Sequence, residues 1–62
     1  TLGVVGVGAV GQAVVQRAIA FGMRVLGTDI APISDTFVKS TGLEVVSLEE
    51  ILSNADYEFR ND

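Results

Sequence analysis

The stretch GVVGVGAVGQ, from Gly3 to Gln12, decides how the chain begins to fold. Glycine loses more backbone freedom on folding than any other residue, so glycines at positions 3, 6, 8 and 11 need a structural reason. Leu2–Gly6 is a short apolar run, typical of a strand covered on both faces in a parallel sheet. From Ala9 onward the apolar residues recur at helical spacing. The stretch therefore predicts a strand, a glycine-rich turn and a helix in succession.

The predicted helix is amphipathic, runs for about three turns and ends at Gly22, a residue suited to a left-handed C-cap. Its other face is polar or small and should meet solvent. The residues expected to face the core are Gly11, Val14, Val15, Ala18, Ile19 and Phe21.

Further strands and helices alternate after Gly22. Met23–Thr28 predicts a second strand, and Pro32 marks the turn that follows it. Ser34 is expected to cap a short helix over Asp35–Thr41, which Gly42 stops. Leu43–Val46 predicts a brief third strand.

The last part of the chain predicts a third helix and a fourth strand. Ser47 and Glu50 have the spacing of a capping box, with Ser47 at the N-cap. The helix that they open should turn Leu48, Ile51 and Leu52 inward and end within Asn54–Asp56, and Tyr57–Arg60 predicts the fourth strand.

The predicted order is therefore β-α-β-α-β-α-β, with connections too long for hairpins. Strands that alternate with helices indicate an α/β fold with a parallel sheet and right-handed crossovers. Residues 1–62 are expected to form one domain at most. Because the chain starts at Thr1 rather than at methionine, we expect it to be a segment of a longer protein.

Residues Gly6–Gly11 form a G-x-G-x-x-G motif between the first strand and the first helix. In a dinucleotide-binding motif the first glycine permits the tight turn. The second, here Gly8, lets a pyrophosphate approach the backbone, and the third lets helix and strand pack closely. The N-terminus of the helix offers N–H groups and a positive dipole end to the phosphates.

Asp29 stands about twenty residues beyond the motif, at the end of the second predicted strand, where an acid is expected. Its carboxylate would accept hydrogen bonds from the adenosine ribose and repel a 2′-phosphate, so NAD is favoured over NADP. This context favours a Rossmann-like sheet that is half of a doubly wound dinucleotide-binding domain. The alternative is that the glycines serve packing alone and that Asp29 is a turn residue.

Composition excludes several other kinds of site. The chain contains no histidine and no cysteine, which argues against an ordinary zinc or transition-metal site and leaves Ser34 and Ser47 without an activating base. Glu49 and Glu50 suit the first turn of a helix better than a catalytic pair. A net charge of −4 without a basic stripe argues against nucleic-acid binding. No apolar run approaches the roughly 18 residues of a membrane span, and a cytoplasmic location is the default.

Three segments carry a resemblance to a known family: TLGVVGVGAVGQAV, AFGMRVLGTD and LEVVSLEEILSNAD. Together they resemble the cofactor-binding domain of the D-isomer-specific 2-hydroxyacid dehydrogenases, which include phosphoglycerate dehydrogenase, over about Thr1–Asp56. The resemblance implies NAD as the cofactor, with Asp29 on the adenosine ribose and Ile30 beside the adenine. It assigns the phosphate loop to Gly6, Gly8, Ala9, Val10 and Gly11.

The chain departs from that family in two respects. The arginine, acid and histidine that perform hydride transfer in the family lie downstream of this segment, so no catalytic residue is assigned and the isolated chain is expected to be inactive. The family continues with an apolar strand and a proline-containing loop, whereas Tyr57–Asp62 alternates in polarity. We expect that strand to lie beside the first and to point Glu58 and Arg60 at water. The alternative is an unrelated tail without a strand.

Three functions remain open from the sequence. The first is the NAD-binding segment of a D-2-hydroxyacid dehydrogenase, which would transfer a hydride between NAD and a 2-hydroxy acid, with the remainder of that enzyme as its partner. The second is a minimal or engineered Rossmann-like module with weak or no ligand binding, which would associate with a second copy through its open edge. The third is an FAD- or nucleotide-sugar-binding fold that shares the same loop.

Overall fold

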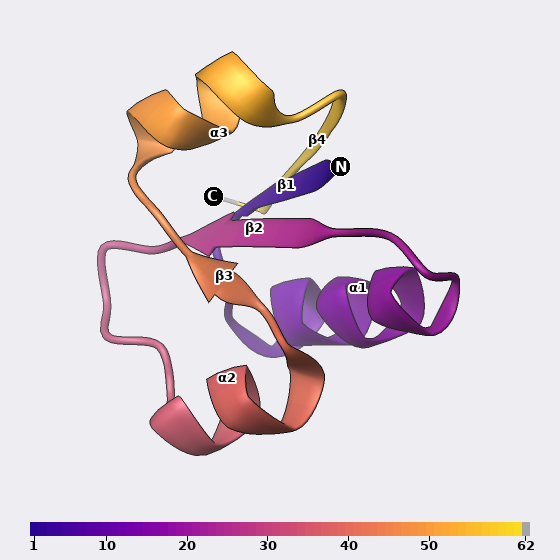
Figure 1. Cartoon of the computed structure of the whole chain (residues 1–62). Helices are drawn as coiled ribbons and strands as arrows, with labels where there is room; N and C mark the ends of the chain where they lie inside the picture. Colours follow the sequence, from indigo (N-terminus) through magenta and orange to yellow (C-terminus); the bar gives the residue numbers. More distant parts are fainter. Residues whose placement is uncertain (62) are drawn as a thin grey trace.

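Four parallel strands form a single sheet in the computed structural model, which describes residues 1–61. The strand order is β3-β2-β1-β4, so the first strand lies in the interior of the sheet (Figure 1). The strands are β1 (Leu2–Val5), β2 (Val25–Thr28), β3 (Glu44–Val45) and β4 (Tyr57–Arg60). This order confirms the predicted position of the fourth strand beside the first.

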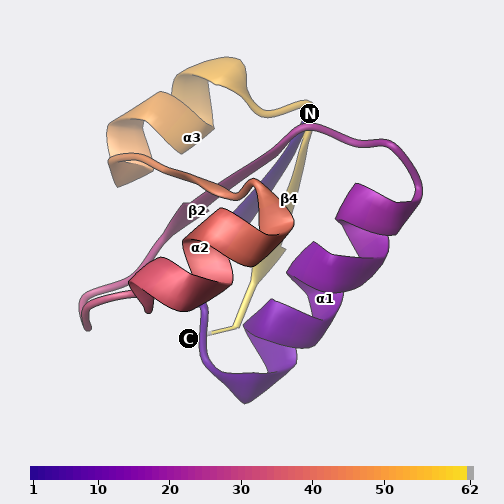
Figure 2. The same ribbon diagram turned by 60° about the horizontal axis from the view of Figure 1, so that its bottom comes forward.

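Helices cover both faces of the sheet. Helices α1 (Ala9–Ala20) and α2 (Asp35–Thr41) lie side by side on one face, and α3 (Leu48–Asn54) lies on the other (Figures 1 and 2). The predicted α/β class and the predicted order of elements are confirmed. None of the helices in the described part of the chain is both long and apolar enough to cross a membrane.

The sheet separates two groups of buried side chains. On the α3 face, Ile51 is fully buried and lies where a Cβ on Gly3 would be, so the missing side chain lets α3 approach the sheet. On the opposite face, a Cβ on Gly27 would meet Leu43 and Val7. The larger buried cluster consists of Val4, Val7, Val15, Ala18, Val25 and Leu43.

The caps expected at Ser34, Ser47 and Gly42 are present, whereas the C-cap of α1 is Phe21, and Gly22 follows it with a left-handed φ of 85°. The Ser34 hydroxyl accepts a hydrogen bond from Phe37 N at 3.4 Å, and the Ser47 hydroxyl accepts one from Glu50 N at 3.2 Å. Gly42, which follows α2, has a φ of 80°. At that angle a side chain would strain the backbone, so glycine ends the helix where the sequence predicts.

Strand β3 is shorter than expected. Only Glu44 and Val45 pair with β2, opposite Leu26 and Gly27, although the prediction covered Leu43–Val46. Leu43 is buried with the core residues beneath the sheet rather than paired in the ladder. Leu43 is therefore apolar because it packs in the core after α2, and not because it belongs to the strand.

Three apolar residues expected to face the core are exposed instead. Phe21 is 87% exposed because α1, at about 18 Å, is longer than the four-residue strands at about 13 Å, and its end projects past the sheet. Leu48 and Leu52 are 41% and 55% exposed. Helix α3 is the single described helix on its face, so only Ile51, at the centre of its apolar stripe, is covered.

Tyr57–Arg60 forms a strand, so the alternative of a tail without a strand is wrong there, and Asp62 of the tail lies outside the described residues. Phe59 packs against the buried cluster, opposite Val4 of β1. Glu58 and Arg60 lie on the other face and pair with each other, with 3.0 Å between Arg60 Nη2 and Glu58 Oε1. Their side chains are 31% and 47% exposed, so the expectation that they face water holds in part.

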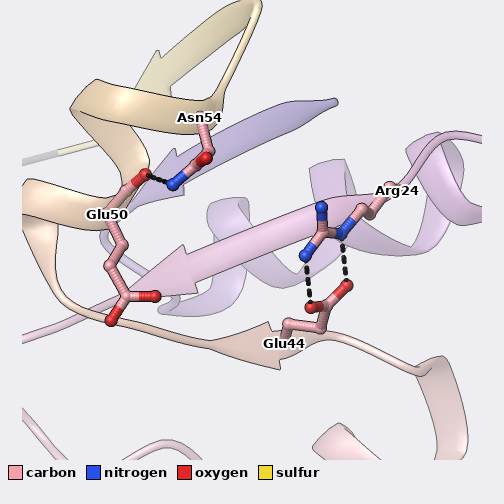
Figure 3. Close-up of polar contacts among 4 residues, drawn as sticks. All are labelled: Arg24, Glu44, Glu50 and Asn54. Atoms are coloured by element: carbon pink, nitrogen blue, oxygen red, sulfur yellow. Dashed lines mark hydrogen bonds and ion pairs between the residues drawn. The ribbon is translucent and has the colours of Figure 1, made fainter.

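An exposed ion pair ties the start of β2 to the start of β3 (Figure 3). Arg24 Nε and Nη2 donate to the two carboxylate oxygens of Glu44 at 2.8 and 2.9 Å. At the end of α3, Asn54 Nδ2 donates to the Glu50 carbonyl, one turn earlier in the same helix, at 2.9 Å. The hydrogen bond and charge of Arg24 lower the pKa of Glu44 below its ordinary value.

This ion pair predicts that the folded chain loses stability as the pH falls. A carboxyl with a lower pKa in the folded than in the unfolded chain adds stability above its unfolded pKa, and that stability is lost as the pH falls through the folded pKa. We expect the urea midpoint to fall between about pH 5 and about pH 2, and to fall less steeply in Glu44→Gln. Urea unfolding followed by circular dichroism tests this. Identical pH profiles for both chains would contradict it.

Candidate dinucleotide site

The turn between β1 and α1 depends on glycine at two positions. Gly6 has a φ of 96°, and its N–H donates to the Thr28 carbonyl at 2.9 Å, where the chain leaves the sheet. A Cβ on Gly11 would collide with the carbonyl oxygen of Gly6. Gly6 therefore permits the turn, and Gly11 permits α1 to pack closely against β1. These are the structural roles that the motif predicts for its first and third glycines.

Gly8 occupies the N-cap of α1 and faces open space. Its φ of −84° is accessible to any residue, and a Cβ there would meet no atom within 4 Å. Gly8 has no side chain with which to cap the helix, and the first turn of α1 carries no acid. The first bond of the helix runs from Gln12 N to the Gly8 carbonyl, so the N–H groups of Ala9, Val10 and Gly11 have no partner within the helix. This end of α1 can receive an anion.

Asp29 follows β2 directly and is held by the backbone. Its Oδ1 accepts a hydrogen bond from Ala31 N at 3.0 Å, and its Oδ2 accepts one from Val7 N at 2.7 Å. The N–H groups of Ala31 and Val7 lower the pKa of Asp29 below its ordinary value, so the carboxylate is charged at neutral pH. The carboxylate thereby connects the end of β2 with the glycine turn.

A cavity of about 280 Å³ lies at the carboxyl ends of the strands, beside Asp29. Its base includes the last residues of three neighbouring strands, because Val5 pairs with both Thr28 and Arg60. Ligands of open α/β sheets bind at this edge, next to the strand at which the order of the sheet reverses. The lining residues are Val5, Gly6, Thr28, Asp29, Ile30, Leu48 and Arg60.

The structure divides the predicted site residues into two adjoining groups. Gly6, Asp29 and Ile30 line the cavity, whereas Gly8, Ala9, Val10 and Gly11 lie at the start of α1 and do not. The Val7–Asp29 hydrogen bond joins the two groups. An apolar cavity with one carboxylate, next to N–H groups that have no partner within α1, suits a nucleoside that carries phosphates.

Sequence reasoning missed several lining residues. Arg60 was expected at a solvent-facing position, yet it borders the cavity and brings a cation to the same space as Asp29. Leu48 was assigned to the core and instead lines the cavity wall. Thr28 and Arg60 could have been identified, since each ends a predicted parallel strand and such ends meet at one edge of a sheet. Within residues 1–61 no cluster of acidic side chains suited to a metal ion is found.

Comparison with known proteins gives a family and several relatives. The family model "D-isomer specific 2-hydroxyacid dehydrogenase, NAD binding domain" matches residues 1–59. A glyoxylate reductase of Korarchaeum cryptofilum is 47% identical over 57 residues, and a D-3-phosphoglycerate dehydrogenase of Methanocaldococcus jannaschii is 45% identical over 58. Each alignment covers 92% of this chain but only 17% and 11% of the respective relative. The chain thus spans less than a fifth of the length of these proteins.

Proposed function

Because the chain belongs to the NAD-binding domain family of the D-isomer-specific 2-hydroxyacid dehydrogenases, with NAD as its cofactor, we propose that it binds NAD at this edge of the sheet. The N–H groups at the start of α1 bind the pyrophosphate, and the cavity receives the adenosine. Asp29 accepts hydrogen bonds from the ribose, and Ile30 flanks the adenine. The proposed binding residues are Gly6, Gly8, Ala9, Val10, Gly11, Asp29 and Ile30.

The observation that carries this proposal is the combination of an uncapped helix N-terminus and a charged carboxylate at one edge of the sheet. Gly8 leaves the space that a phosphate needs to reach the amides. A carboxylate has about four acceptor positions, and the bonds from Val7 and Ala31 occupy two of them. Asp29 can therefore accept from a ribose hydroxyl without releasing the backbone.

We further propose that residues 1–62 form a partial NAD-binding domain of a larger dehydrogenase acting on a 2-hydroxy acid. NAD supplies a hydride acceptor when bound, and the residues of this chain bind and orient it. The chain contains no histidine, so the acid–base residue that such an oxidation needs is assigned to the remainder of the enzyme. The isolated chain is expected to bind NAD without catalysing the reaction.

The first prediction from this proposal is ligand-dependent stability. ADP-ribose at about ten times its Kd should add about 1.4 kcal/mol and raise the Tm by about 6–11 °C for a domain of this size. The analogue with a 2′-phosphate should produce a smaller rise, because its added charge approaches the Asp29 carboxylate. Differential scanning fluorimetry or calorimetry measures both shifts. No shift with ADP-ribose or NAD at about 5 mM would contradict the proposed function.

The alternative function is a self-associating Rossmann-like module with little ligand binding. Exposed apolar side chains favour it, among them Phe21, Leu52 and Tyr57. Sedimentation equilibrium distinguishes the two, since a chain that associates and does not respond to ADP-ribose supports the module. A chain that responds to ADP-ribose, and loses that response in Asp29→Ala, supports the NAD site.

A further inference from the structure

Asp29 contacts the glycine turn as well as its own neighbours. Val7 N–H donates to Asp29 Oδ2 at 2.7 Å, across 22 positions of sequence. Val7 stands between Gly6 and Gly8, and its own side chain is buried in the core. The Asp29 carboxylate thus accepts from the Val7 N–H, which points away from the sheet and makes no strand-to-strand hydrogen bond.

This contact fixes the part of the backbone with the most freedom. Gly6 has a positive φ, and a Cβ on Gly8 would meet no atom within 4 Å, so neither residue beside Val7 has a side chain that packs. Gln12 Nε2 donates to the Val7 carbonyl at 3.4 Å, but no side chain other than that of Asp29 accepts from the Val7 N–H among the described residues. The buried Val7 side chain anchors one point, and the Val7–Asp29 hydrogen bond fixes the orientation of the peptide there. The direction of the following amides, at the start of α1, depends on that orientation.

We propose that Asp29 is a positioning residue for the phosphate-binding turn, in addition to the ribose contact given above. The proposal rests on the proposed NAD site and extends it: ligands that contain phosphate but no ribose also depend on Asp29. A turn that is in its binding shape for a fraction of the time lowers the apparent affinity by that fraction. The acidic residue raises anion affinity through the backbone although its own charge opposes the anion.

Positioning of the turn by Asp29 favours anion binding, whereas the negative charge of Asp29 opposes it. Inorganic pyrophosphate, which contains no ribose, therefore gives a decisive test. A ribose contact alone predicts that Asp29→Ala binds pyrophosphate as well as the unaltered chain or better, because a negative charge has been removed. The positioning role predicts that its affinity falls about tenfold. Asp29→Asn retains an oxygen that can accept from Val7 N–H, and it should restore pyrophosphate binding to within about twofold of the unaltered chain. Titrations of ¹⁵N-labelled chains followed by NMR measure all three.

Asp56→Ala is the matched control. It removes a carboxylate that also accepts a hydrogen bond, from the N-terminal amine at 2.8 Å, but beside the opposite end of β1. Its pyrophosphate affinity should not fall. Failure of the unaltered chain to bind either pyrophosphate or ADP-ribose would overturn the proposed function itself. Binding by the unaltered chain that persists in Asp29→Ala would overturn the positioning role alone.

A second measurement needs no variant. In the unliganded chain, the Val7 amide should exchange with solvent at least about tenfold more slowly than the amides of Ala9 and Val10, after correction for intrinsic rates. Equal rates would overturn the proposal, because the bond to Asp29 would then not hold the turn. This comparison remains decisive if Asp29→Ala does not fold.

Discussion

Replacing Gly8 with aspartate should make the chain more stable and, at the same time, a weaker ligand-binding protein. Aspartate is a preferred N-cap residue, and its charge interacts favourably with the N-terminal end of the helix dipole. The position is open and its φ of −84° suits any residue, so we expect a gain of about 0.5–1 kcal/mol. The same carboxylate would occupy the amides proposed for the pyrophosphate and repel it, lowering the affinity for ADP-ribose by about tenfold or more.

Thermal unfolding and isothermal titration with ADP-ribose measure the two effects of Gly8→Asp separately. Gly8→Ser is the matched control, because serine caps the helix without adding charge. It should stabilise the chain to a smaller extent and lower the affinity less than aspartate does. If Gly8→Asp retained the affinity of the unaltered chain, the phosphates could not lie at the start of α1.

Replacing Gly11 with alanine should unfold most of the chain at room temperature. In an ordinary helix interior this change is favourable by about 1 kcal/mol. Here the added methyl group would enter the space of the Gly6 carbonyl oxygen, which belongs to backbone held by the sheet and cannot move aside as a side chain can. Overpacking of this kind costs about 1–3 kcal/mol or more, and a single core of this size rarely supplies more than about 3–5 kcal/mol.

Gly8→Ala is the matched control for this second effect, because it adds the same methyl group three positions earlier, where nothing lies within 4 Å. Circular dichroism should show helix and sheet in Gly8→Ala and a largely unfolded spectrum in Gly11→Ala. A folded Gly11→Ala with an unchanged Tm would mean that α1 can shift away from the strand. The close contact at Gly6 would then not be essential.

The fold was predictable because its signals are local. Apolar runs bounded by glycine gave the strands, and serine or glycine at the helix ends gave the boundaries within one or two residues. The burial of individual helix residues was harder to predict from the sequence, because it depends on how far the sheet extends beneath each helix. Phe21 has the right position on a helical wheel, but α1 extends beyond the strands there.

The same contrast applies to the candidate site. The glycine spacing and the position of Asp29 identified the turn and the acid, since both are set by short-range geometry. Arg60 and Leu48 reach the cavity only because β4 lies beside β1 and α3 covers the opposite face. The hydrogen bond from Val7 to Asp29 likewise joins segments that no local pattern connects.

The central position of β1 has a consequence for the order of events during synthesis. Its residues are made before those of β4, so one of its two edges stays unpaired until Tyr57–Arg60 has also emerged. Until then the chain can form β1, α1 and β2 as a unit with an open strand edge, and such an edge can pair with other chains. Pairing across the whole chain also makes folding slower than in a protein built from local contacts. This part of the nascent chain is therefore most exposed to misassembly just before Tyr57–Arg60 is made.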